Sequence, residues 1–191
     1  MKFRWRMLDK KRQEIRVLDL DAGAEESPLS GQLRHIFLDE PDKACYETIS
    51  YVWGDAALVA SISLDDELVR IPASAASALR RMRLPSMSRT LWIDCICIDQ
   101  HDDDEKGHQV GMMADIFQNS SRTLAHLGDD DGGNNDTKRA FDDLAMIYDM
   151  LQVENAFINI LHMIDPELGY SLRNKVDLEA IGTIMGRPYF Q

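Results

Sequence analysis

The chain has 191 residues, enough for one domain with or without an appendage, and its 45% hydrophobic and 28% charged residues are typical of a globular protein. The formal net charge of −12 disfavours nucleic acid and anionic membrane surfaces as partners, because a field of that sign repels phosphate groups. Three cysteines, with no secretory signal at residues 1–16, predict reduced thiols and a cytoplasmic location. The most apolar late stretch, residues 146–164, is interrupted by charged side chains and predicts no membrane span.

Two β-strands are predicted in the first 45 residues. Residues 14–20 alternate between polar and apolar side chains, which is typical of a half-buried strand. A loop that contains Gly23, Pro28 and Gly31 separates this strand from a second one predicted over residues 32–38. We therefore expect residues 1–45 to form an N-terminal β-hairpin region that leads into the domain.

The next elements are a strand, a hairpin and a helix. Residues 46–53 are rich in β-branched and aromatic side chains and predict a central strand that ends at Gly54. Residues 59–64 and 67–71 flank two aspartates and predict a short hairpin. An alanine-rich segment, residues 73–83, predicts a helix whose closing arginines suit the negative end of its dipole.

Residues 91–98 form a nearly continuous apolar run, which predicts a strand buried on both faces, as in a parallel sheet. Such a strand would direct Cys95 and Cys97 toward the same side. The acids at 102–104 predict the start of a helix, whose apolar positions at helical spacing are Val110, Met113, Ile116 and Phe117. Residues 122–127 predict one more strand, so the alternation of strands and helices favours an α/β domain with a mostly parallel central sheet.

A loop of Asp, Gly and Asn at residues 129–136 separates this part from three predicted helices at 138–152, 155–164 and 176–185. The predicted organisation is therefore an N-terminal region (1–45), a core (46–128) and a helical C-terminal part of the same domain (129–191). The loop does not fit a calcium-binding EF-hand, because its sixth and twelfth positions hold Asn134 and Ala140. We also expect no metal site, because His101 and His108 lack a third ligand at zinc spacing.

Polar and aromatic side chains gather where two predicted strands end. One set follows the strand at 46–53 and the other lies in or after the run at 91–98; together they are Ser50, Tyr51, Trp53, Gly54, Asp55, Asp94, Asp99 and Gln100. Ligands of open α/β sheets bind at the carboxyl ends of strands, so these residues form a candidate ligand site if the two strands are neighbours. The alternative is structural: Asp94 accepts hydrogen bonds from loop amides, and Glu105 only favours the start of a helix.

Three segments resemble the motifs of a known family. Residues 46–55 read YETISYVWGD, residues 91–100 read LWIDCICIDQ, and the positions from Glu105 to Gly128 match a third motif in order and spacing. They resemble the motifs of the fungal heterokaryon-incompatibility (HET) domain, with Asp99 where Asn is more usual. The resemblance covers residues 14–128.

The resemblance implies a module of fungal nonself recognition that triggers programmed cell death through association with itself or with a sensor protein. The HET family is distantly similar to TIR domains, of flavodoxin-like architecture, some of which cleave NAD with a glutamate. On that analogy the loop at Ser50 to Asp55 borders a nucleotide pocket, with NAD as a substrate and no resident cofactor. The family's terminal Arg-x-Trp-x-x-Gln-Glu motif is expected directly after residue 190 and is not in this chain. The resemblance thus leaves three readings: a signalling module, an NAD-cleaving enzyme with Glu105 as a substitute carboxylate, and a truncated, inactive fragment.

Overall fold

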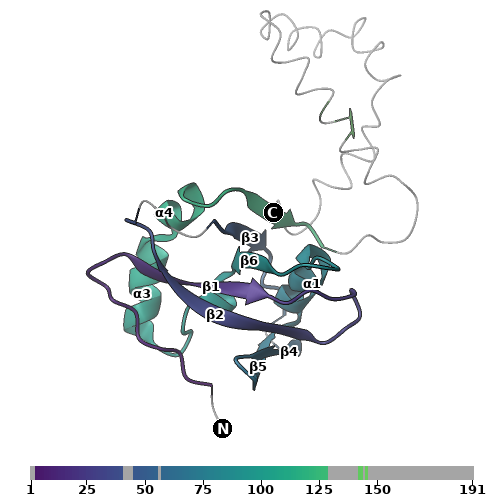
Figure 1. Ribbon diagram of the computed structural model, residues 1–191, viewed down its shortest axis with the longest axis horizontal. Helices are drawn as coiled ribbons and strands as arrows, with labels where there is room; N and C mark the ends of the chain where they lie inside the picture. The colour runs from purple at the N-terminus through teal and green to yellow at the C-terminus, as the bar shows by residue number, and fades with distance from the viewer. Residues whose placement is uncertain (1–2, 41–44, 56, 129–141, 144, 146–191) are drawn as a thin grey trace, which may run out of the picture. The chain divides into compact units, whose positions relative to one another are not determined.

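The computed structural model describes residues 3–40, 45–55, 57–128, 142, 143 and 145 (Figure 1). The chain divides into two compact units, Met1–Gly128 and Asp129–Gln191. The described elements follow one another in the order β1 (Glu14–Leu20), β2 (Leu29–Phe37), β3 (Glu47–Tyr51), β4 (Val59–Leu64), β5 (Glu67–Pro72), α1 (Ala73–Met82), β6 (Arg89–Trp92), α2 (Asp94–Cys97), α3 (Asp103–Gly111), α4 (Met113–Gln118) and β7 (Thr123–His126).

The seven strands form one sheet in the order β5-β4-β2-β1-β6-β3-β7. The predicted α/β class is confirmed, but the prediction of a mostly parallel sheet is wrong. The pairs β1–β2, β1–β6 and β4–β5 are antiparallel, whereas β2–β4, β3–β6 and β3–β7 are parallel. The sheet is mixed because β1 lies between β2 and β6 and runs against both of them, as Figure 1 shows.

The predicted N-terminal hairpin is confirmed, with β1 and β2 in one-to-one register from the pair Glu14–Phe37 to the pair Leu20–Gly31. The loop between them is held by Arg83, whose guanidinium donates to the carbonyl groups of Ala24, Glu25, Ser27 and Pro28. The predicted hairpin of β4 and β5 is also confirmed. Its two turn residues, Asp65 and Asp66, both have positive φ angles, of 48° and 66°, a conformation that aspartate tolerates better than most residues.

The apolar run at 91–98 is not one strand. Strand β6 ends at Trp92, and the short helix α2 takes over at Asp94, whose carboxylate accepts a hydrogen bond from the Cys95 amide at 2.7 Å. An uninterrupted apolar run fits any element that is buried on all sides, so the pattern could not separate strand from helix. Cys95 and Cys97 therefore lie on a buried helix and not on one side of a strand.

The helix predicted after Asp102 exists, and the Asp102 side chain caps it by accepting from the Glu105 amide. It is two helices, α3 and α4, which meet at Met112, and Val110 is half exposed and does not face the core. The alanine-rich helix α1 is confirmed. The later predicted helices lie outside the described residues, except that Asp142, Asp143 and Ala145 are helical.

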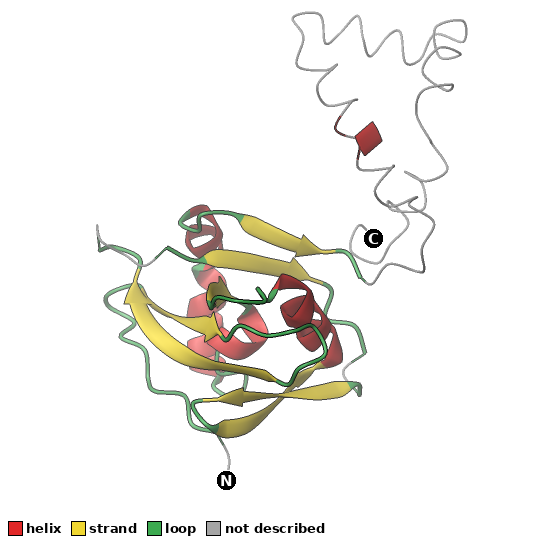
Figure 2. Cartoon of the chain, turned by 45° about the vertical axis from the view of Figure 1, so that its right-hand side comes forward, coloured by secondary structure: helices red, strands yellow, loops and turns green. Residues whose placement is uncertain are grey.

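Helix α1 packs against β2, β3, β4 and β5, although β3 and β5 lie far apart in the sheet order. The sheet must curve for one helix to reach all four strands, and Figure 2 shows this curvature. Ala75, Ala76 and Ala78 are fully buried, because their small side chains allow the close approach. In the part of the chain that the structure describes, no helix combines the length and the apolar composition needed to cross a membrane.

Candidate functional site

The strands that carry the two predicted sets of polar residues are neighbours. β3 and β6 pair in parallel, with Glu47 opposite Leu91 and Thr48 opposite Trp92. Parallel neighbours end at the same edge of the sheet, so the residues after Tyr51 and after Trp92 meet there. This is the placement on which the predicted site depends.

Asp94 is the centre of this edge. Its carboxylate accepts hydrogen bonds from the Tyr51 hydroxyl at 3.1 Å and from the Trp53 indole Nε1 at 2.9 Å, in addition to the Cys95 amide. Trp53 remains 45% exposed, so the bond to Asp94 presents an indole to solvent in a fixed orientation. Asp94, a carboxylate within an apolar run, thus has the hydrogen-bond donors that it was expected to need, and two of the donors are themselves predicted site residues.

Two further predicted residues follow α2. Gln100 donates from its side-chain amide to the Asp94 carbonyl oxygen at 3.0 Å, so it fixes the backbone of the central residue. Asp99 instead accepts from the His101 amide at 3.0 Å and donates its own amide to Glu105 at 2.7 Å. Gln100 therefore belongs to the Asp94 cluster, whereas the contacts of Asp99 are local to its turn.

The loop after β3 is tied to the start of α1. The Trp53 carbonyl accepts from the Ser74 hydroxyl at 2.6 Å, and Gly54 has a φ of 67°, which favours glycine. Asp55 accepts from the Ala57 amide at 2.8 Å and so closes a local turn. Ser50 lies one residue before the cluster, opposite Ala125 of β7.

Glu105, the candidate catalytic acid, is 5% exposed and forms a bidentate ion pair with Arg16 of β1. The nitrogen–oxygen distances are 2.5 and 2.9 Å, and the same two terminal nitrogens of Arg16 also donate to the carbonyl groups of Cys97 and Arg6. Arg16 was not predicted as a functional residue. The signal was available, since an arginine stands between apolar positions of a buried strand and must find an acid there. These contacts are those of a structural pair, and the catalytic role of Glu105 stays a prediction.

Burial determines which groups at this edge ionise. Burial raises the pKa of Tyr51 well above its ordinary value, and the neighbouring Cys95 and Asp94 side chains add to the effect, so the hydroxyl stays protonated and donates. Burial also raises the pKa of the Cys95 thiol, and it raises that of Cys97 to about 12. Neither cysteine is therefore a nucleophilic thiolate at neutral pH.

The remaining residues of the resembling motifs hold elements together. The Tyr46 hydroxyl donates to the Ile116 carbonyl at 2.6 Å, which joins the start of β3 to α4. The Gln109 side-chain amide donates to the Glu14 carbonyl at 3.1 Å, which joins α3 to β1. Among the described residues there is no group of three His, Cys, Asp or Glu side chains that could hold a metal ion.

Comparison with known proteins gives one family. The family model for heterokaryon incompatibility protein (HET) matches residues 46–162, which is more than half of the chain. The chain is also similar to heterokaryon incompatibility protein 6, OR allele, of Neurospora crassa, with 34% identity over 115 residues. That match covers 53% of this chain and 16% of the relative, so the chain corresponds to a small part of that protein's length. No solved structure matches the chain.

Proposed function

Since the chain belongs to the heterokaryon incompatibility (HET) family, we propose that it is a signalling module of fungal heterokaryon incompatibility. In this proposal the module triggers programmed cell death through regulated association with itself or with a sensor protein. The observation that carries the proposal is the cluster at the ends of β3 and β6, where two of the family-like motifs meet at Asp94.

The cluster has the properties of a recognition surface. Trp53 is 45% exposed and Leu58 is 60% exposed, and both belong to one loop that is bonded through its carbonyl groups to Ser74 and Ala73 of α1. An exposed indole on a rigid support is a common anchor in protein interfaces, because it buries a large area at little entropic cost. We infer that the partner contacts Trp53 and that Asp94 keeps the indole in its binding orientation.

Expression of variants in fungal cells tests this role. Trp53→Ala and Asp94→Asn are expected to abolish cell death while the protein still accumulates in folded form. The matched control is Leu68→Ala, since Leu68 is an exposed apolar side chain of β5 outside the cluster. Cell death at the wild-type level in both cluster variants would refute the proposal, and so would loss of killing in the control alone.

A second candidate function is cleavage of NAD at the nicotinamide bond, by analogy with TIR domains. The specific observation in its favour is a carboxylate beside an exposed indole at the carboxyl ends of two parallel strands. A carboxylate close to the ribose can stabilise an oxocarbenium-like centre, and an indole can stack on a planar base. Incubation of the purified chain with NAD should then release nicotinamide, with loss of activity in Asp94→Asn. Absence of nicotinamide release by the folded protein would remove this candidate.

A further inference from the structure

Strand β2 extends well beyond the strand on its outer side. β1 pairs with β2 from Gly31 to Phe37, but β4 pairs with it only opposite Leu29, Ser30 and Gly31. The β4 strand stops there because its chain turns at Asp65, whose amide donates to the Gly31 carbonyl at 3.2 Å. Within the described part of the chain, the outer edge of β2 from residue 32 to residue 37 has no neighbouring strand.

Among the described residues, no backbone group pairs with the outward-directed backbone groups on this edge. The Ser30 carbonyl accepts from Asp21 on the β1 side, whereas the Gly31 carbonyl accepts on the β4 side. Backbone groups alternate along a strand, and the register with β1 has no bulge, so the odd-numbered residues Leu33, His35 and Phe37 direct their N–H and C=O groups outward. The described residues provide no hydrogen-bond partner for these groups, and such an edge is a template for another strand.

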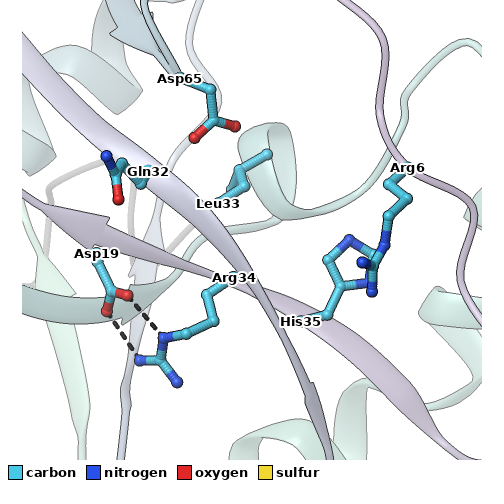
Figure 3. A pocket seen from close by; sticks show the side chains of 7 residues that line it. All are labelled: Arg6, Asp19, Gln32, Leu33, Arg34, His35 and Asp65. Atoms are coloured by element: carbon cyan, nitrogen blue, oxygen red, sulfur yellow. Dashed lines mark hydrogen bonds and ion pairs between the residues drawn. The ribbon is translucent and has the colours of Figure 1, made fainter.

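A groove runs along the same edge. A hollow of about 430 Å³ lies here, and its lining includes Arg6, Leu33, His35 and Asp65, whose side chains are labelled in Figure 3. These four residues also line a second hollow of about 220 Å³, which continues toward the N-terminal segment. We call the two hollows together the β2-edge groove.

The groove has an apolar end. Phe3 and Trp5 line the second hollow, with their rings edge to face and 4.9 Å between centroids. The Trp5 indole donates to the Ile96 carbonyl at 2.9 Å, which fixes it against α2. Aromatic side chains held in this way can receive an apolar side chain from a strand that lies along β2.

The lining of the groove includes four arginines and two aspartates, of which Asp19 pairs with Arg34 and Asp65 lines both hollows. Arg4 is exposed and has no ion-pair partner among the described residues, and Arg6 is 75% exposed with its nearest acid, Glu14, at 3.6 Å. Arg16 lines the groove as well; its charge is neutralised by Glu105, but its buried Nε–H group lacks a hydrogen-bond acceptor among the described residues. Two exposed arginines, Arg4 and Arg6, on one edge of a chain with a net charge of −12 favour an acidic ligand there.

We propose that the β2-edge groove binds an extended acidic peptide segment of a partner protein, which adds to the sheet as a strand beside β2. The segment's backbone pairs with Leu33, His35 and Phe37, and its acidic side chains approach Arg4 and Arg6. A second copy of this chain fits less well, because pairing β2 with itself brings the same arginines of two copies together. The site is separate from the Asp94 cluster and does not depend on its function.

Selection from a random octapeptide library displayed on phage, with the full chain as bait, identifies the peptide. We expect the selected peptides to alternate acidic residues with apolar or β-branched ones. The binding of one labelled selected peptide to the wild type and to four variants is then measured by fluorescence polarisation. Failure to enrich any peptide, or enrichment of basic ones, would overturn the proposal.

The variants test separately the contribution of backbone pairing and that of the arginine charge to peptide binding. Leu33→Pro removes an outward N–H group without removing a bond to β1, and Arg6→Glu reverses a charge on the groove; each is expected to weaken binding about tenfold or more. Arg70→Glu is the matched control, since Arg70 is exposed on β5 outside the groove, and it should bind as the wild type does. If Leu33→Pro does not fold, Arg6→Glu still decides the question.

Equal binding by Arg6→Glu and the wild type would refute the peptide site, as would a concentration-dependent dimer that Arg6→Glu strengthens. Trp53→Ala, which tests the proposed function, should leave peptide binding unchanged. The two proposals can therefore fail independently.

Discussion

The buried ion pair between Arg16 and Glu105 makes a sharp prediction, because it separates a structural from a catalytic role. The two side chains are 1% and 6% exposed, and two hydrogen bonds of 2.5 and 2.9 Å join them. Glu105→Gln keeps the shape but leaves the Arg16 charge buried without its counter-ion. Loss of one partner of a buried pair lowers the free energy of unfolding by about 3–5 kcal/mol. This is a large part of the roughly 5–15 kcal/mol that stabilises a typical domain.

Urea unfolding of the full chain, monitored by circular dichroism, measures this change in the free energy of unfolding from the midpoint and slope of the transition. The informative control is the double variant Arg16→Met with Glu105→Leu, which removes both charges and should recover part of the lost stability, since the backbone groups that Arg16 and Glu105 bond still lose their partners. A loss below about 1 kcal/mol in Glu105→Gln would contradict the structural role that the contacts indicate, since exposed pairs contribute only that much. Such a result would favour the prediction that Glu105 is catalytic.

Three further predictions concern stability and reactivity. Gly31→Ala should lower the free energy of unfolding by about 1–3 kcal/mol, because its Cβ would stand 2.6 Å from a β1 carbonyl oxygen; Gly107→Ala, with nothing within 4 Å, should not. Burial lowers the pKa of His35 below 6.5, so the unfolded chain takes up the proton at a higher pH than the folded chain does. The free energy of unfolding should therefore decrease as the pH is lowered from about 7 to about 5. Urea midpoints across that range should fall less in His35→Gln. A thiol reagent should modify only the exposed Cys45 in the native protein and all three cysteines in urea; fast reaction of either α2 thiol would contradict their burial.

Local patterns predicted the local elements well. The alternation at 14–20 predicted β1 with its observed ends, although the strand is buried at every position except Asp19 and not half-buried as predicted, because it lies at the centre of the sheet. The two aspartates at 65 and 66 form the turn expected between β4 and β5. The direction of pairing could not be predicted in the same way. It depends on the insertion of β1 between β2 and β6, and residues as far apart as Leu18 and Leu91 establish that pairing. No short window of sequence contains this information.

In the candidate site, too, local sequence predicted some contacts and long-range topology determined others. The motif spacing predicted that Tyr51, Trp53 and Asp94 meet, because Tyr51 and Trp53 close one predicted strand and Asp94 is the one acid within the neighbouring apolar run. The partner of Glu105 could not be found by spacing, because Arg16 lies 89 positions away on a strand outside the region that the family model matches. The sequence signals that Arg16 needs an acid, but the topology is required to identify that acid as Glu105.

The family match begins at residue 46, yet β1 and β2 precede it and β1 occupies the centre of the sheet. Truncation mapping is a common way to assign activity to a domain, and the natural cut here would be at the start of the match. A fragment that begins at residue 46 would leave β6 without its antiparallel neighbour and Glu105 without its cation. If that fragment failed to kill cells, the failure would reflect an incomplete sheet and would not test the role of Asp94. Deletions that are meant to locate the signal should therefore begin upstream of Glu14.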